Sequence, residues 1–194
     1  MKGALYMSKV TWKPGTMLYP LPPVMVSCGT MENPNVITVA WTGIACSDPA
    51  MTYISVRPER HSYGLIKKTG EFVINLTTES LIWAADYCGV KSGRDISKFD
   101  LPDITAVPSS IVSAPMIQES PLNIECSVDR ILSLGSHDMF LSKILAINAD
   151  ENLLDTKGVL HLEKAKLVAT SHGKYFSLGR QLGTFGYSVK KKKK

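Results

Sequence analysis

The chain has 194 residues, of which 44% are hydrophobic and 20% charged, a composition that is typical of one folded domain and excludes a disordered chain. Residues 190–194 are all lysine and account for the formal net charge of +5, because the 17 other basic residues balance 17 acidic ones. A neutral body without a basic stripe argues against nucleic-acid binding. We expect a single domain over residues 1–189 and a solvated lysine tail over 190–194.

Cysteine usage and the N-terminal pattern bear on the compartment. The four cysteines are widely spaced and form neither a CxxC pair nor a zinc-type cluster with histidine, so we expect reduced thiols in a cytoplasmic protein. The first residues lack the basic-then-apolar pattern of a signal peptide. Residues 14–31 are uncharged, but four prolines in this stretch exclude a spanning helix. We therefore expect no membrane segment.

The N-terminal third of the chain reads as β-structure. A proline-rich, extended lead-in occupies residues 1–23, and short runs of β-forming residues follow at 24–29, 34–43 and 51–58. Glycine, proline, asparagine and aspartate separate these runs, which is typical of an antiparallel meander. The spacing predicts tight connections between neighbouring strands.

The run at residues 34–43 has two unlike faces. Side chains alternate along an extended chain, which puts bulky apolar groups on one face and small or hydroxyl-bearing groups on the other. The bulky set is Ile37, Val39 and Trp41, and the small set is Val36, Thr38, Ala40 and Thr42. The small face is suited to the close approach of a ligand or of another backbone.

Two short helices interrupt the strands. The first is expected within residues 60–70, with Ser62 as its cap and Gly70 as its stop. A strand at 71–78 follows, and a second helix opens at Thr78 or Ser80 and closes at Gly89.

The second half of the chain begins with a long polar, proline-marked loop at residues 90–120, a length that indicates function or disorder. Two long β-runs, 122–135 and 137–150, meet at a Gly-Ser turn and predict a hairpin. Many short strands with two small helices favour a mainly β, closed or nearly closed barrel, since closure removes exposed strand edges. A sandwich is the alternative.

No signature of hydrolytic or metal chemistry is present, and the chain lacks a Walker A loop and a GxGxxG motif after a strand. The four histidines are scattered and read as structural or surface residues. Cys88 has Lys91 and Arg94 nearby, which could lower the pKa of its thiol, but a cysteine on the apolar side of a helix is more often packed.

One stretch points to an anion. "ISVRPERHSYGLI" carries Arg57, Arg60, His61 and Ser62 from a strand end into the start of a helix, where free N–H groups and the helix dipole favour a phosphate. An ordinary capped and solvated helix explains the same residues.

Six motifs in order give a resemblance. They are YPLPPVMVSCG, NVITVAWTG, DPAMTYISVRPERHSYGLI, GEFVINL, CGVKSGRDISKF and GSHDMFLSKI. Together they resemble the flavin reductase-like, FMN-binding split-barrel family, and its flavoredoxin branch in particular, from about Pro20 to Gly179. The final lysine run is not a feature of that family.

The resemblance implies a homodimer whose split, Greek-key-like β-barrel binds FMN near the subunit interface. FMN would take a hydride from NAD(P)H, as in a flavin reductase, or electrons from a protein, as in a flavoredoxin-like carrier. No catalytic side chain is needed, since the chemistry belongs to the flavin. The alternative is a non-enzymatic module, either a flavin- or haem-binding split barrel or an adaptor that uses its lysine tail on an acidic partner.

The resemblance also assigns the site residue by residue. Asn35 and Trp41 would contact or frame the cofactor, beside the hydroxyls of Thr38 and Thr42. The phosphate turn falls on Arg57 and Ser62, with Arg60 less firmly placed; Tyr63 would support the ribityl chain or the helix packing. Lys98 and His137 would place cations near the flavin, Gly89 and Ser92 would shape the loop, and Tyr175 or Phe176 would supply an aromatic ring against it.

Overall fold

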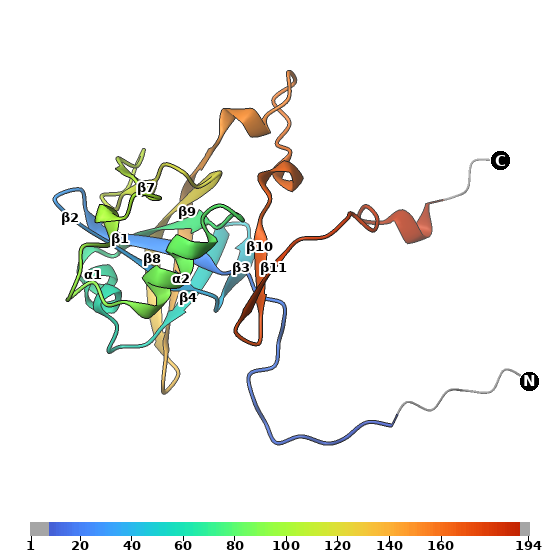
Figure 1. The fold of residues 1–194 in the computed structure, drawn as a ribbon, viewed down its shortest axis with the longest axis horizontal. Helices are drawn as coiled ribbons and strands as arrows, with labels where there is room; N and C mark the ends of the chain where they lie inside the picture. Colours follow the sequence, from blue (N-terminus) through green and yellow to red (C-terminus); the bar gives the residue numbers. More distant parts are fainter. Residues whose placement is uncertain (1–7, 191–194) are drawn as a thin grey trace, which may run out of the picture.

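The structure is a computed structural model that describes residues 8–190, and its main element is a seven-stranded antiparallel sheet in the order β2-β1-β5-β8-β9-β4-β3 (Figure 1). The sheet strands are β1 Val24–Thr30, β2 Asn33–Val39, β3 Thr42–Ser47, β4 Ala50–Val56, β5 Glu71–Leu76, β8 Leu122–Ser133 and β9 Asp138–Ala149. Buried side chains of β1, β2, β4, β5, β8 and β9 meet in one core, whereas β2 and β3, at the two ends of this order, are not hydrogen-bonded to each other. The sheet therefore curls into a barrel that is split beside Trp41, as predicted, and the sandwich alternative is wrong.

Two helices and several short elements complete the fold. The helices are α1 His61–Thr69 and α2 Ile82–Val90. The short strands are β6 Ala106–Val107, β7 Met116–Ile117, β10 Val168–Ser171 and β11 Lys174–Ser177, and the 3-10 turns are Lys98–Asp100, Glu151–Leu153, Leu162–Ala165 and Tyr187–Val189. No helix within residues 8–190 is both long and apolar enough to cross a membrane.

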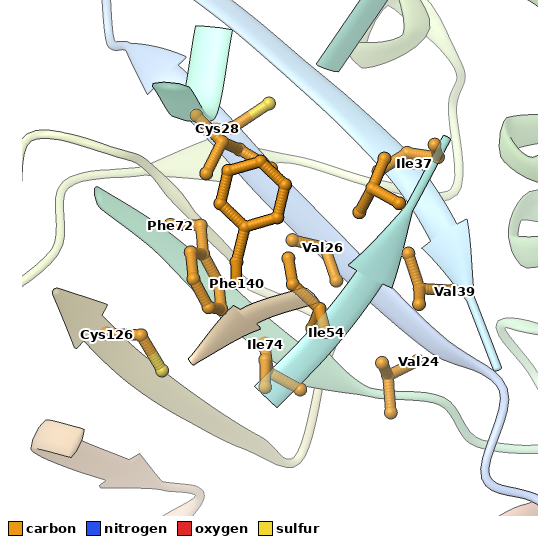
Figure 2. Packing of buried hydrophobic residues seen from close by; sticks show 12 residues of the cluster. Val24, Val26, Cys28, Ile37, Val39, Ile54, Phe72, Ile74, Cys126 and Phe140 are labelled. Carbon is orange, nitrogen blue, oxygen red and sulfur yellow. The ribbon is translucent and has the colours of Figure 1, made fainter. Parts of the chain in front are cut away.

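The barrel interior is filled by side chains of six strands. Figure 2 shows Phe72 and Phe140 among the apolar side chains of this core. The other buried members are Val24, Val26, Cys28, Ile37, Val39, Ile54, Val56, Ile74 and Cys126, with Ile66 contributed by α1. Each buried apolar side chain contributes about 1.5–3 kcal/mol, so this cluster is the main source of stability.

A second cluster explains why β2 has two faces. Met25 and Val36 point away from the barrel interior and pack against Ala84, Ala85 and Cys88 of α2. β1 and β2 are therefore covered on both sides, and the small face of β2 accommodates the helix. All four cysteines are free thiols.

Several element boundaries differ from those predicted. The run at residues 34–43 is not one strand, because β2 ends at Val39 and β3 begins at Thr42. Arg60, not Ser62, is the N-cap of α1, and no side chain caps that helix end. Leu81, not Thr78 or Ser80, precedes α2, which continues past Gly89 to Val90. The hairpin of β8 and β9 is confirmed, and so is Gly70, whose φ of 71° ends α1.

A buried carboxylate fixes the long loop to the barrel. Glu125 on β8 is fully buried and accepts the backbone N–H groups of Ser110, Ile111 and Val112 at 2.7–2.9 Å, with Asn148 Nδ2 at 2.7 Å. Burial alone would raise the pKa of Glu125, but these hydrogen bonds favour the ionised form and bring the pKa below its ordinary value. The loop is thus held by a carboxylate that stays charged.

Candidate functional site

Two adjoining cavities lie where β2, β4, α1 and α2 meet. The first, here called the β2 cavity, has a volume of about 230 Å³ and is lined by Ile37, Thr38, Val39, Ala40, Trp41, Ser55, Val56, Arg57, Arg60, Gly89 and His137. The second, here called the α1 cavity, has a volume of about 150 Å³ and is lined by Ile37, Glu59, Arg60, His61, Ser62, Val90, Lys91, Ser92, Gly93, Arg94 and Lys98. Ile37 and Arg60 belong to both, so Arg60 stands at their junction.

The α1 cavity has the features of an anion site. The chain turns from β4 into α1 through a hydrogen bond from Arg60 N to Arg57 O of 3.1 Å. Tyr63 N donates to Arg60 O at 3.0 Å, but the first helical turn carries no acidic residue and no side-chain cap, so the N–H groups of His61 and Ser62 are left for a ligand. Lys91 and Arg94 add positive charge from the loop that follows α2. This set of donors suits a phosphate.

Asn35 and Ser62 form a buried pair under that cavity. Asn35 Nδ2 donates to Ser62 Oγ at 2.7 Å, and both side chains are buried. The Ser62 hydroxyl keeps its own proton for another acceptor. Beneath the pair, burial raises the pKa of the Cys28 thiol to about 12, against the smaller lowering effects of Ser62, Asn35 and Lys98. Cys28 is therefore a neutral, packed thiol.

The loop after α2 approaches the barrel closely because of its glycines. A Cβ at Gly93 would collide with Asn35 Oδ1 and would stand 2.9 Å from His61 Cδ2. A Cβ at Gly89 would stand 3.3 Å from the Cβ of Thr38, and the carbonyl of Gly89 accepts a hydrogen bond from the Arg60 guanidinium. Only glycine at position 93 permits the present α1 cavity.

Lys98 lines the α1 cavity but is occupied by the protein itself. Its side chain is 2% exposed, and Nζ donates to Val36 O and to Cys88 O, each at 2.7 Å. Burial lowers the pKa of Lys98, and Arg60 acts in the same direction. Lys98 therefore ties β2 to α2, which differs from the expected lysine that reaches out to a flavin. Burial also raises the pKa of Cys88 to about 11, so that thiol is packed as well.

Trp41 and His137 form the rim of the β2 cavity. Their ring centroids are 4.4 Å apart with an interplanar angle of 33°, and Trp41 remains 38% exposed, outside the core. Burial lowers the pKa of His137 below its ordinary 6.5, as does the positive charge of Arg57, against a smaller raising effect of Glu59. His137 is then mainly neutral at pH 7, and the fixed positive charge of this cavity comes from Arg57 and Arg60.

Thr38 lines the β2 cavity, although its hydroxyl donates to Ala85 O of α2. The small face of β2 is thus largely covered by a helix, and the hydroxyl of Thr38 serves the packing.

The other predicted site residues lie outside both cavities. Thr42 Oγ1 donates to Tyr53 O at 2.6 Å, and Tyr63 OH donates to Asp138 Oδ2 at 2.6 Å. Tyr175, on β11, donates to Asp86 at 2.8 Å, and its neighbour Phe176 is half exposed. Within one chain, Tyr63 therefore has a packing role, and neither aromatic residue of β11 reaches the cavities.

Among the residues that line the α1 cavity, the two cations Lys91 and Arg94 and the closely approaching Gly93 were not predicted as site residues. Lys91 and Arg94 were considered only for their effect on Cys88, and Gly93 was not considered at all. The sequence does contain a signal, since the Lys-Ser-Gly-Arg run combines two cations with a glycine, which is a common composition for an anion-binding loop.

Comparisons with known proteins agree with this arrangement. A family model described as "Flavin reductase like domain" matches residues 16–171. The chain is 34% identical over 139 residues to an uncharacterized protein of Pyrococcus abyssi, covering 72% of this chain and 80% of the relative. It is 30% identical over 165 residues to an uncharacterized protein of Archaeoglobus fulgidus, covering 82% and 93%.

Two solved structures share the architecture. Flavoredoxin of Desulfovibrio vulgaris (Miyazaki F) matches with a TM-score of 0.86 at 28% identity, over 94% of this chain and 100% of that chain. Flavoredoxin from Methanosarcina acetivorans matches with a TM-score of 0.85 at 22% identity, over 95% and 100%, which shows the fold alone.

The split barrel with a cavity at its opening thus belongs to a protein of the flavin reductase-like family. Within that family the chain falls in the flavoredoxin branch. Both the family and the fold class are as the six motifs indicated.

Proposed function

We propose that this protein binds FMN, with the phosphate in the α1 cavity and the ring system in the β2 cavity, and that it transfers electrons through it. The observation that carries the proposal is the uncapped start of α1, which opens beside Lys91 and Arg94 and adjoins a cavity edged by Trp41. FMN has an anionic end and a flat ring, and these cavities offer a separate environment to each.

The residues fit such a ligand in chemistry and in placement. The α1 cavity supplies backbone N–H groups and cations, and Arg60 lies at the junction of the two cavities. The β2 cavity is bounded by Ile37 and Val39 as well as by an indole and an imidazole ring. Small-molecule sites combine apolar walls with a few placed polar groups in this way.

Each residue then has a defined role. Bound FMN would supply the redox chemistry, taking electrons from a donor and passing them to an acceptor. Arg60 and Arg57 would stabilise negative charge at the reduced ring. Trp41 with His137 would shield one edge of the ring from water, and Asn35 would hold Ser62 and the start of α1 in position.

We propose an FMN-dependent oxidoreductase with NAD(P)H as donor, working as a cytoplasmic homodimer; a flavoredoxin-like carrier is the variant that takes electrons from a protein. The non-enzymatic flavin- or haem-binding module is the second candidate. Its lysine-tail version rests on residues 190–194, of which 191–194 lie outside the described part of the chain. We propose neither nucleic acid nor a membrane as a binding partner in either function.

The test begins with the visible spectrum of the purified protein and an FMN titration of the apo-protein. We expect oxidised-flavin absorption and stoichiometric binding, which Ser62→Ala and Trp41→Ala weaken. Turnover of NAD(P)H with bound FMN and an artificial acceptor would support the reductase, and no turnover would favour the carrier. A protein that stays colourless when FMN is added would contradict both.

A further inference from the structure

Two arms leave the barrel without being bonded to it. The N-terminal arm, residues 8–18, makes no hydrogen bond to any other described residue; the first backbone link is the pair Leu21 and Thr170. The C-terminal arm, residues 179–190, begins after Leu178 N, which donates to Leu167 O at 3.4 Å, and its hydrogen bonds among the described residues are internal. Figure 1 shows both arms extending from the same side of the molecule.

The C-terminal arm has a shaped tip that carries unprotected apolar groups. Backbone bonds from Tyr187 N to Thr184 O, 2.9 Å, and from Val189 N to Gly186 O, 3.2 Å, fold the tip. On this tip Phe185 is 108% exposed and Leu182 is 84% exposed. A folded element that presents fully exposed large apolar side chains indicates a binding surface.

The total surface leads to the same conclusion. The chain exposes 13119 Å², whereas a compact monomer of 21.2 kDa exposes roughly 9,100 Å². The excess of roughly 4,000 Å² is larger than the roughly 800 Å² that each partner contributes to a standard interface. Both arms carry exposed apolar side chains, among them Trp12, Leu18, Leu182 and Phe185, which stay in contact with water unless another molecule covers them.

A matching apolar cavity lies at the base of the arms. It has a volume of about 360 Å³ and is lined by Gly15, Thr16, Met17, Leu18, Leu21, Trp41, Thr42, Tyr53, Ser55 and Met139. Leu21 is also the residue that pairs with β10, which in turn pairs with β11, from which the C-terminal arm departs. The arm therefore leaves the barrel close to this cavity.

We propose that the C-terminal arm of a second copy of this chain seats Leu182 and Phe185 in this apolar cavity, and that the two copies exchange arms reciprocally. An arm that departs and arrives on one face fits a two-fold dimer, in which the same patch serves both subunits. From Leu178 to Phe185 an extended chain spans up to about 25 Å, which is enough to reach a facing copy.

The arm exchange also has a consequence for FMN binding, and this consequence rests on the proposed function. Trp41 and Ser55 line both this apolar cavity and the β2 cavity. A seated arm would pack against one side of the Trp41 wall while FMN lies on the other. Dimer dissociation should therefore weaken FMN binding, and by linkage FMN should tighten the dimer by the same factor.

The experiment is sedimentation velocity of the full-length chain without FMN, across a dilution series. The double variant Leu182→Ser, Phe185→Ser should raise the dimer dissociation constant by about a hundredfold or more, because buried aromatic and apolar anchors dominate interfaces. Ile111→Ser removes an apolar group of 60% exposure from the loop over Glu125 and should leave dissociation unchanged.

A mixing test separates arm exchange from misfolding. Met139→Lys puts a charge into the receiving cavity and should also dissociate the dimer. Equimolar Met139→Lys and Leu182→Ser, Phe185→Ser chains should re-form a dimer, since one intact arm meets one intact cavity. A full-length monomer at all concentrations, an unaltered dimer of the double variant, or a mixture that stays monomeric would each overturn the exchange. FMN titration of the unaltered chain reports the proposed cofactor site independently of these variants.

Discussion

Arg60→Ala is the sharpest test of the cofactor site. Arg60 lines both cavities and donates to the carbonyl of Gly89. Among the described residues Arg60 has no salt-bridge partner, whereas Arg57 pairs with Glu59 at 3.6 Å. Its positive charge is therefore the less compensated of the two. Loss of one charge-assisted hydrogen bond costs about 1.5–3 kcal/mol, which corresponds to a roughly 10- to 150-fold rise in the FMN dissociation constant.

The assay is flavin fluorescence quenching with apo-protein at low and at physiological salt. Arg57→Ala should weaken binding less, because the Glu59 carboxylate already compensates that charge. Arg130→Ala is the matched control, since Arg130 pairs with Asp129 at 2.8 Å on the exposed side of β8. Arg60→Ala with an affinity within about twofold of the parent would refute the assignment of the α1 cavity to an anion.

Three further predictions follow from the contacts described above. Glu125→Gln should lower the free energy of unfolding by about 3 kcal/mol and the Tm by roughly 6–12 °C. Because the pKa of Glu125 in the folded protein lies below 4.5, the stability advantage of the parent is complete above that pH and disappears as the pH falls through the folded pKa. Urea unfolding at two pH values measures this difference, and equal stability at pH 7 would contradict it. Lys98→Met removes the hydrogen bonds to the carbonyls of Val36 and Cys88 and should lower the free energy of unfolding by about 2–4 kcal/mol, measured in the same way. A change below about 0.5 kcal/mol would show that the two bonds do not matter. Trp41→Ala should weaken FMN binding by about tenfold, whereas the control Trp83→Ala, which removes an exposed indole stacked on Tyr87, should not; equal effects would remove Trp41 from the site.

Local patterns predicted the strands well and the helix starts poorly. Alternation with turn residues located β1, β4, β5 and the β8–β9 hairpin, because strand register depends on a period of two that is visible in the sequence. The observed helix starts differ from the predicted ones because Arg60 and Leu81 precede their helices without a capping side chain. The usual signal of serine or threonine is therefore absent from those positions.

The break between β2 and β3 had no local signal. The alternation continues from Ile37 through Val39 to Trp41, and no glycine or proline marks Ala40. What ends β2 is tertiary, since Trp41 O accepts a hydrogen bond from Ser55 N of β4. Alternation of side chains indicates an extended segment, but it does not indicate where that segment changes its hydrogen-bonding partner strand.

The site was predictable where it is local. Arg57 to Ser62 are contiguous, so their meeting at a helix start follows from the order of residues. Lys98 shows the opposite case, because its acceptor on Val36 is 62 positions away. Such distant pairings depend on topology, which sequence patterns within one chain do not encode.

The two cavities adjoin because of how the split in the barrel is built. β2 and β3 separate at Ala40, which leaves room beside the ends of β2 and β4, and the β2 cavity lies there. Since only four residues separate the end of β4 from the start of α1, its uncapped first turn must face the same opening. The β2 cavity and the α1 cavity are thus placed side by side by one short connection, and Arg60 lies within it. A cofactor with a ring and a phosphate needs both features at that separation, so the geometry of this turn limits which flavins the protein can hold.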